Sequence, residues 1–84
     1  MYKLDPTKAF ARSLKKLSGK EQNSVAVKLK LLAKNPYHPS LRTKKVQGIK
    51  DVFECSVNMD IRILWKHEGN RLILLIDIGH HDIL

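Results

Sequence analysis

The spacing of apolar residues divides the chain into a helical first half and a second half made of strands. In two stretches, apolar residues recur every three or four positions, which is typical of amphipathic helices. These residues are Phe10, Leu14 and Leu17, followed by Val25, Leu29 and Leu32. Ser18 and Glu21 have the spacing of a capping box, so the second helix is predicted to begin directly after a tight corner. Asn35 followed by Pro36 predicts its end.

A short strand is predicted before the first helix. Tyr2 and Leu4 lie on one side of "MYKLD", which we interpret as a first strand. Asp5 before Pro6 resembles an N-cap residue followed by a proline at the first helical position. Because the corner between the two helices is tight, we expect them to form an antiparallel hairpin.

The second half begins with a long loop and continues as three strands. Residues 36–51 show no periodicity and contain two prolines, so they are predicted to be the longest loop. Apolar and polar residues alternate over 52–57 and again over 60–67, as in half-buried strands. Residues 71–79 are almost entirely apolar, which predicts an internal strand covered on both faces. Short turns between these segments predict an antiparallel meander.

The sequence therefore predicts a single α+β domain over residues 1–84, with the order β-α-α-β-β-β. It consists of an N-terminal strand, an antiparallel helical hairpin and a three-stranded antiparallel meander. The one cysteine, Cys55, excludes an internal disulfide and fits a reducing cytosol. The charged N-terminal residues do not resemble a signal peptide, and the longest apolar run, 72–76, is too short to cross a bilayer. We expect a small soluble protein of the cytoplasm that does not contact membranes.

The charge is distributed unevenly along the chain. Residues 1–50 hold 13 Lys or Arg and two acidic residues, whereas residues 51–84 hold three basic and six acidic residues. Such an asymmetry is typical of proteins that bind nucleic acid or another polyanion. The alternative interpretation is a lysine-rich helical surface that only contributes solubility.

Few residues could carry chemistry, because the chain has no glycine-rich phosphate loop, no Cys/His metal spacing and no G-x-S-x-G turn. The predicted meander can bring Arg62, on its second strand, close to His80 and His81 at the end of its third. Neighbouring residues on an extended chain point to opposite sides, so His80 and His81 are not expected to bind one metal ion together. We expect one of the two imidazoles to take part in proton transfer.

An arginine that binds phosphate and a histidine that transfers a proton indicate metal-free RNA cleavage, in which the ribose 2′-hydroxyl attacks the adjacent phosphate. The alternative is that both histidines are surface residues and that Arg62 pairs with Glu54.

The last forty residues resemble the second half of the RelE/ParE superfamily of toxins from type II toxin–antitoxin systems, nearest the YafQ-like branch. The motifs that carry the resemblance are "KVQG", the pair Glu54-Cys55, "DIRILW" and the closing "IGHHDIL". The predicted order of elements also agrees over the whole chain. The resemblance implies a RelE-like fold.

The resemblance also implies a function. Members of this branch are endoribonucleases that cut mRNA in the ribosomal A site without a metal or cofactor, inhibit translation, and are held inactive by a co-expressed antitoxin. By position, Arg62 matches an arginine that binds the scissile phosphate, His81 a general acid or base, and Asp60 an acidic residue at the turn. The partners implied are the antitoxin, the ribosome and mRNA. The residues then expected to contact RNA are Arg42, Lys44, Lys45 and His80.

The chain departs from the YafQ-like pattern at four places. Lys45 and Ser56 stand where these toxins carry histidines, Asp77 stands where an arginine is expected, and the chain stops at Leu84 without a terminal aromatic residue. Two further hypotheses therefore stay open. One is a non-cleaving toxin of the ParE type, which inhibits DNA gyrase, and the other is an inactive relative that only binds an antitoxin or RNA.

Overall fold

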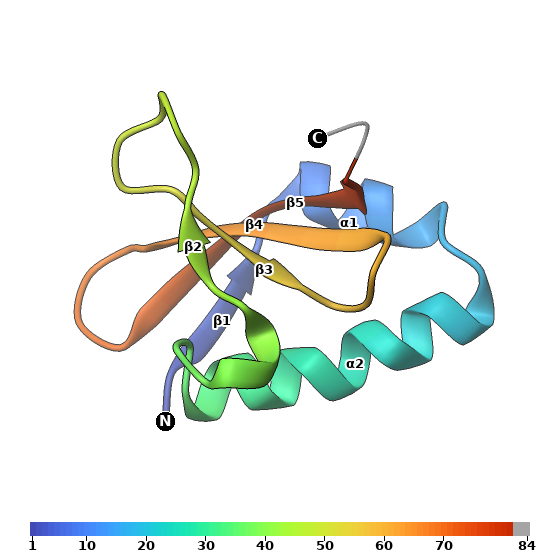
Figure 1. Cartoon of the computed structure of the whole chain (residues 1–84), viewed down its shortest axis with the longest axis horizontal. Helices are drawn as coiled ribbons and strands as arrows, with labels where there is room; N and C mark the ends of the chain where they lie inside the picture. Colours follow the sequence, from blue (N-terminus) through green and yellow to red (C-terminus); the bar gives the residue numbers. More distant parts are fainter. Residues whose placement is uncertain (82–84) are drawn as a thin grey trace.

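The computed structural model describes residues 1–81 and contains the predicted elements in the predicted order (Figure 1). The helices are α1 (Lys8–Lys15) and α2 (Gly19–Lys34), with a 3₁₀ turn, η1 (Pro39–Leu41). The strands are β1 (Lys3–Pro6), β2 (Lys44–Lys45), β3 (Phe53–Ser56), β4 (Ile61–His67) and β5 (Leu72–His80). Two elements, η1 and β2, lie in the segment for which the sequence predicts only a loop.

The strands form one mixed sheet in the order β1-β5-β4-β3-β2. The meander of β3, β4 and β5 is antiparallel, as predicted. The first strand, β1, runs parallel to the last strand, β5, and lies beside it in Figure 1. β2 pairs with β3 at the opposite edge. The α+β prediction is therefore confirmed, and the sheet has one strand more than the sequence indicates.

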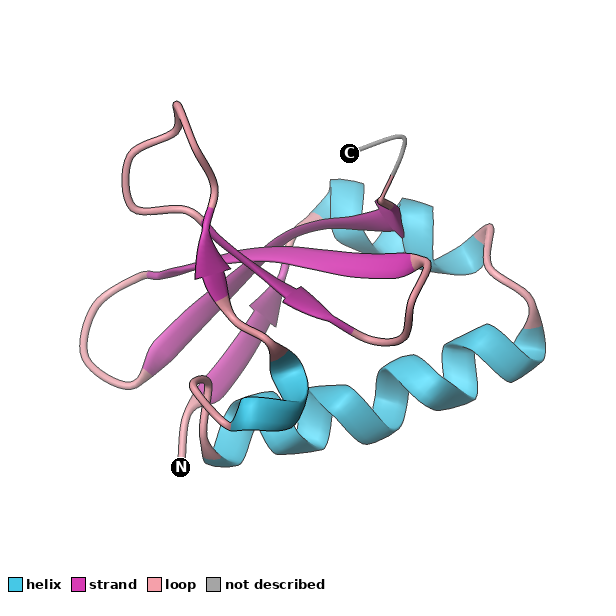
Figure 2. Ribbon diagram, viewed as in Figure 1, coloured by secondary structure: helices cyan, strands magenta, loops and turns pink. Residues whose placement is uncertain are grey.

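One face of the sheet packs against the helices and forms the core (Figure 2). The strands β3 and β4 contribute alternate residues to it, as the pleat requires, and β5 contributes Ile73, Leu75 and Ile78. On β4 these residues are fully buried, and they are Ile61, Ile63 and Trp65. The helices contribute the residues of their predicted stripes, of which Phe10, Leu17, Val25 and Leu32 are buried.

The opposite face of the sheet is less covered than the sequence predicts. The strand at 71–79 is internal, as expected, but its residues Leu72, Leu74 and Ile76 are only partly buried. Because the stripes of both helices join the core on the other face, the expectation that β5 is covered on both faces was wrong. An apolar run in the sequence therefore does not distinguish a strand that is buried on both faces from a strand with one face partly exposed.

A β-bulge divides β5 into two halves. Leu64 pairs with Asp77 and Trp65 pairs with Leu75, so Ile76 is an extra residue opposite the β4 strand. The extra residue changes the phase of the alternation, and the buried positions of β5 are spaced by two and then by three residues. The half before the bulge pairs with β1, and the half after it carries the end of the sheet where His80 lies.

The first helix begins later than the sequence predicts. Asp5 and Pro6 belong to β1, where Pro6 pairs with Leu75, so the prediction of an N-cap at Asp5 was wrong. The N-cap is Thr7, whose hydroxyl accepts a hydrogen bond from the Phe10 amide and donates one to the Ile76 carbonyl. Proline is tolerated in β1 because β1 is an edge strand. The Thr7 hydroxyl thus joins the start of α1 to β5.

The start of α2 agrees with the prediction in detail. The Ser18 amide donates to the Glu21 carboxylate at 2.9 Å, and the Glu21 amide donates to the Ser18 hydroxyl at 3.1 Å, so both bonds of the capping box are present. The helix ends at its C-cap Asn35, directly before Pro36. Within residues 1–81, neither helix has the length and apolar character needed to cross a membrane.

Substitution of Ser18 by Ala should lower the free energy of unfolding by about 1 kcal/mol, because the Glu21 amide loses its acceptor. Ser24→Ala is the matched control. Its hydroxyl donates to the Lys20 carbonyl inside the same helix, where alanine is the better helix former. Urea denaturation measures both variants, and equal stability of the two would contradict the importance of the cap.

Candidate active site

Arg62 lies near the start of β4, the central strand, on the sheet face that turns away from the core. Its neighbours on β4, Ile61 and Ile63, are fully buried on the other face. In the sheet register Arg62 pairs with Ser56 on β3 and with Gly79 on β5. Gly79 contributes no side chain beside Arg62, and Ser56 contributes a small hydroxyl.

His81 and Asp60 lie at the end of the same strand pair. The last paired residues are Ile61 and His80, and directly beyond them the His81 amide donates a hydrogen bond of 2.7 Å to the Asp60 carbonyl. Arg62 pairs with Gly79, two residues before His81, so Arg62 and His81 are diagonal neighbours. Such neighbours in an antiparallel pair lie about 7–8 Å apart. The strand register thus places the backbones of Arg62, Asp60 and His81 at the same end of the β4–β5 pair.

Hydrogen bonds to the backbone hold the Arg62 side chain. Its Nη1 atom donates to the carbonyls of Asn58, Met59 and Ile61 at 2.7, 3.1 and 3.2 Å. The Asn58 side chain in turn accepts from the Asp60 and Ile61 amides, which closes the β3–β4 turn. The guanidinium is therefore oriented by the turn.

The expected alternative partner of Arg62 is engaged elsewhere. Glu54 forms an ion pair with Lys44 at 3.1 Å, across the β2–β3 pair. The hypothesis that Arg62 pairs with Glu54 is therefore not supported, and the positive charge of Arg62 stays available on the open face of the sheet. Carbonyl oxygens orient a guanidinium without removing its charge.

A pocket of about 310 Å³ borders Arg62, next to Ser56 and the β3–β4 turn. Two further cations line it, Lys28 from α2 and Arg42 from the residue after η1. Ser40, Ser56 and Asn58 add polar groups. Sequence reasoning named Arg42 but missed Lys28 and Ser40, because no motif connects a residue in the middle of a helix with a strand that comes thirty residues later.

Lys44 and Lys45, which were predicted to contact RNA, lie apart from this pocket. They form the two-residue strand β2 and are exposed. Together with Val46, Gln47 and Glu54 they line a separate depression of about 320 Å³. Since Lys44 is paired with Glu54, Lys45 contributes the unbalanced charge of this depression.

His80 is turned toward the helices. Its Nε2 atom lies 3.3 Å from a carboxylate oxygen of Glu21 at the start of α2. A hydrogen bond from the Ser18 amide, and then the bond to His80, hold the pKa of the Glu21 carboxyl below its ordinary value of 4.5. His80 therefore joins the end of β5 to α2, and its contact with RNA stays a prediction.

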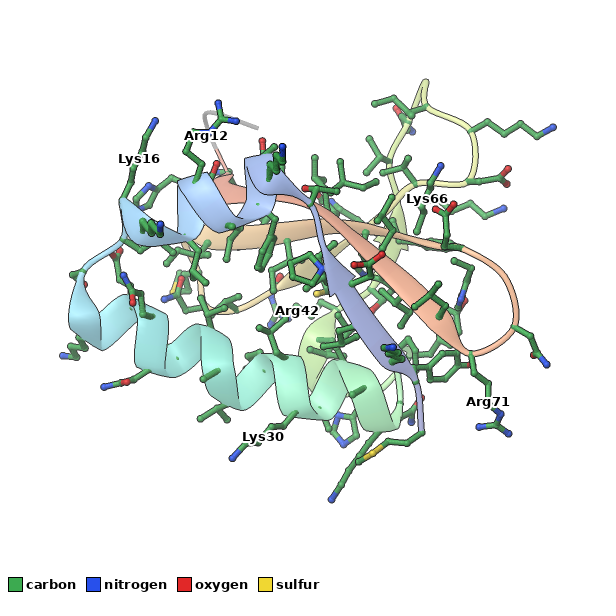
Figure 3. The ribbon with its side chains drawn as sticks, turned by 180° about the vertical axis from the view of Figure 1, so that it is seen from behind. Arg12, Lys16, Lys30, Arg42, Lys66 and Arg71 are labelled. Atoms are coloured by element: carbon green, nitrogen blue, oxygen red, sulfur yellow. The ribbon has the colours of Figure 1, made fainter. Side chains whose placement is uncertain are left out.

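Most of the basic residues of the N-terminal half do not gather at the site. Figure 3 shows Arg12 and Lys16 projecting from the region of α1 and Lys30 projecting from α2, each into solvent. Of the cations before residue 51, the pocket beside Arg62 takes Lys28 and Arg42. Most of the charge excess is thus spread over the helical surface.

The remaining candidates for covalent or metal chemistry do not form a site. Cys55 is 1% exposed, and burial raises the pKa of its thiol to about 12, which disfavours the reactive thiolate. Across residues 1–81, no three His, Cys, Asp or Glu side chains gather in a way that could hold a metal ion.

The chain matches no family model and no curated protein sequence. It does match solved structures. YafQ from Escherichia coli strain BL21(DE3) aligns with a TM-score of 0.79 and 16% identity, over 99% of this chain and 97% of YafQ. The archaeal RelE–RelB complex from Pyrococcus horikoshii OT3 gives a TM-score of 0.77 and 14% identity, over 94% and 93%. HP0894 from Helicobacter pylori, whose structure was determined in solution, gives 0.74 and 23%, over 98% and 97%. The chain has the fold of the RelE and YafQ toxins.

One residue that departs from the YafQ-like pattern has a structural role in this chain. Asp77 stands where an arginine is expected, and its carboxylate accepts hydrogen bonds from the Ser13 hydroxyl at 2.7 Å and from the Ile78 amide at 2.8 Å. This position therefore joins α1 to β5 in the present chain. Asp82 and Leu84, which belong to the closing motif, lie outside the described residues.

Replacing Glu21 by Gln should make the Tm depend less on pH in acidic solution. The Glu21 pKa is lowered in the folded state, so the carboxylate contributes stability above its unfolded value of 4.5, and this contribution is lost as the pH falls through the lower folded value. Gln retains an acceptor oxygen for the Ser18 amide. Between about pH 5 and pH 3, the Tm of the wild type should fall more steeply than that of Glu21→Gln. Glu68→Gln, at an exposed residue of the β4–β5 turn, is the control and should follow the wild type.

Proposed function

We propose that this chain is the toxin of a type II toxin–antitoxin pair, and that it cleaves mRNA on the ribosome with Arg62, His81 and Asp60. The fold supports the class of protein. The observation that carries the activity is the register of β4 and β5, in which Arg62 lies opposite Gly79 and the His81 amide binds the Asp60 carbonyl. An arginine, a histidine and a carboxylate thereby share one end of an open sheet face.

The chemistry assigned to this site needs no bound cofactor. The 2′-oxygen of a ribose forms a bond to the adjacent phosphorus, and the bond from phosphorus to the 5′-oxygen of the next nucleotide breaks. Arg62 binds the non-bridging phosphate oxygens and stabilises the charge that develops on them. The Asp60 carboxylate accepts the proton of the 2′-hydroxyl, and the imidazolium of His81 donates a proton to the departing 5′-oxygen. The products are a 2′,3′-cyclic phosphate and a free 5′-hydroxyl.

The partner assigned to the chain is an antitoxin. Among the similar structures are Escherichia coli complexes of YafQ with DinJ (TM-score 0.80, 17% identity) and of RelE with RelB (TM-score 0.76, 17% identity). A toxin of this kind acts in the cytoplasm, where the ribosome and its mRNA are the target.

A second function is favoured by particular residues. Ser56 takes the place of an expected histidine, and Asp77 is committed to Ser13 and the backbone. A chain that lost two groups of the active site would still fold and bind an antitoxin or RNA. This inactive relative, and a ParE-type inhibitor of gyrase, are the outcomes against which the proposal is tested.

Induced expression in a bacterial host without an antitoxin tests the proposal. Wild type should arrest growth and produce new mRNA 5′ ends, mapped by primer extension, whereas Arg62→Ala and His81→Ala should reduce cleavage by at least about a hundredfold, the usual contribution of one acid–base or oxyanion group. The control is Arg71→Ala, at an exposed arginine of the β4–β5 turn at the far end of the hairpin, which should cleave like wild type.

Growth arrest without new 5′ ends would refute the nuclease and favour a target such as gyrase. Harmless expression of a folded wild-type chain would favour the inactive relative.

A further inference from the structure

We infer that the pocket lined by Lys28, Arg42 and Arg62, called here the basic pocket, binds a second phosphate of the RNA, next to the one that is cleaved. The inference rests on the proposed function, because it names a further contact of the same substrate. It assigns a role in binding to Lys28 and Ser40, which no motif of the sequence marks.

The lining of the basic pocket is suited to an anion. Three cations converge on it from α2, from the residue after η1 and from β4, and its polar groups include the hydroxyls of Ser40 and Ser56. No Asp or Glu is among the described residues that line it. Cations without a neighbouring carboxylate are an unfavourable arrangement unless an anion binds between them. The volume of about 310 Å³ accommodates a phosphate with part of its sugar.

Lys28 occupies a position that a lysine serving solubility would not occupy. It lies three residues after Val25 and four before Leu32, which are both buried, so it is on the apolar stripe of α2. Lys28 is accordingly half-buried, whereas Lys30, two residues later, is exposed. A lysine on such a stripe packs its methylene groups against the core and extends its amine to the edge. That edge is the basic pocket.

Arg42 is held in an unfavourable backbone conformation. It has φ of 51° and ψ of 43°, the left-handed region, which costs a residue with a side chain about 1 kcal/mol or more. The neighbours impose this conformation, because Leu41 is fully buried and the Thr43 hydroxyl donates to the Pro36 carbonyl. Three described residues other than glycine have a positive φ, namely Arg42, Asp51 and Arg71, and Arg42 is the one that lines the basic pocket.

Ser40 is oriented by a histidine. The Nδ1 atom of His38 accepts from the Ser40 amide at 3.1 Å and lies 3.0 Å from the Ser40 hydroxyl. His38 thus fixes the first turn of η1, whose other end carries Arg42. Ser40 and Arg42 therefore line the basic pocket from a segment held in place by His38, and Asn58 and Met59 of the β3–β4 turn line it as well.

The geometry connects the basic pocket to the cleavage site through Arg62, which borders both. Gly79, Arg62 and Ser56 lie in one row across β5, β4 and β3. Strands are about 4.8 Å apart, so the row extends about 10 Å, a distance that adjacent nucleotides can cover. An RNA strand that follows this row would place one phosphate at Arg62 and His81 and the next between Lys28 and Arg42. Asp77 is committed to α1, and the basic pocket adds the positive charges of Lys28 and Arg42 beside Arg62.

The test is equilibrium binding of a short single-stranded RNA whose 2′-hydroxyls are methylated, so that binding is measured without cleavage. The purified chain is compared with Lys28→Gln and with the matched control Lys30→Gln, on the same helix but outside the basic pocket. Lys28→Gln should weaken binding about tenfold, as expected for loss of a charged hydrogen bond, and Lys30→Gln should stay within about twofold of wild type. The slope of log K against log salt should fall by about 0.7 in Lys28→Gln, the value for one phosphate of a single strand.

Arg42→Gly separates binding from folding. Glycine adopts the left-handed conformation without a steric penalty, so this variant should unfold at the same temperature as wild type or above it, while its RNA affinity falls about tenfold. Equal affinities of Lys28→Gln and Lys30→Gln, or an Arg42→Gly variant that binds like wild type, would overturn the inference even if the chain cleaves mRNA. If Lys28→Gln and Arg42→Gly lose RNA affinity but the wild-type chain does not cleave mRNA, the basic pocket is upheld and the nuclease is refuted.

Discussion

The pairing of β4 with β5 is the constraint on which the rest of the structure depends. It places Ile61, Ile63 and Trp65 in the core and Arg62 on the open face, because alternate residues of a strand point to opposite sides. A slip by one residue would exchange the two faces, so the burial of Trp65 also fixes the orientation of Arg62. The stability of the core and the geometry of the site are therefore set by the same hydrogen bonds.

The parts of the fold that the sequence predicts are those whose signal is local and repeated. The helical stripes, the capping box at Ser18 and the alternation in β3 and β4 each contain several residues that favour the same element. The start of α1 was misplaced because Asp5 and Pro6 fit a helix start equally well, and pairing with Leu75 decides between the two. The elements η1 and β2 have three and two residues, which is too short for a period.

In the candidate site, too, only the relations that follow from the order of strands can be predicted from the sequence. An antiparallel meander already predicts that Arg62 and the residues after Gly79 approach each other, so the relation between Arg62, Asp60 and His81 is accessible from the order of strands. The position of Lys28 beside Arg62 cannot be predicted in this way, since the position of α2 along β3 depends on how the side chains between them pack. The contact of His80 with Glu21 has the same origin, because it joins residues 59 positions apart.

The pairing of the first strand with the last has a consequence during synthesis. β1 needs residues 72–75 as its partner, and Arg62 needs residue 79 beside it. Until those residues have left the ribosome, β1 is an unpaired strand and the open face of the sheet lacks its β5 row. Closing so long a segment is also the slow step expected for a sheet of this topology. An unfinished copy thus carries the cations of the N-terminal half without the strand pairing that places Arg62 beside Gly79.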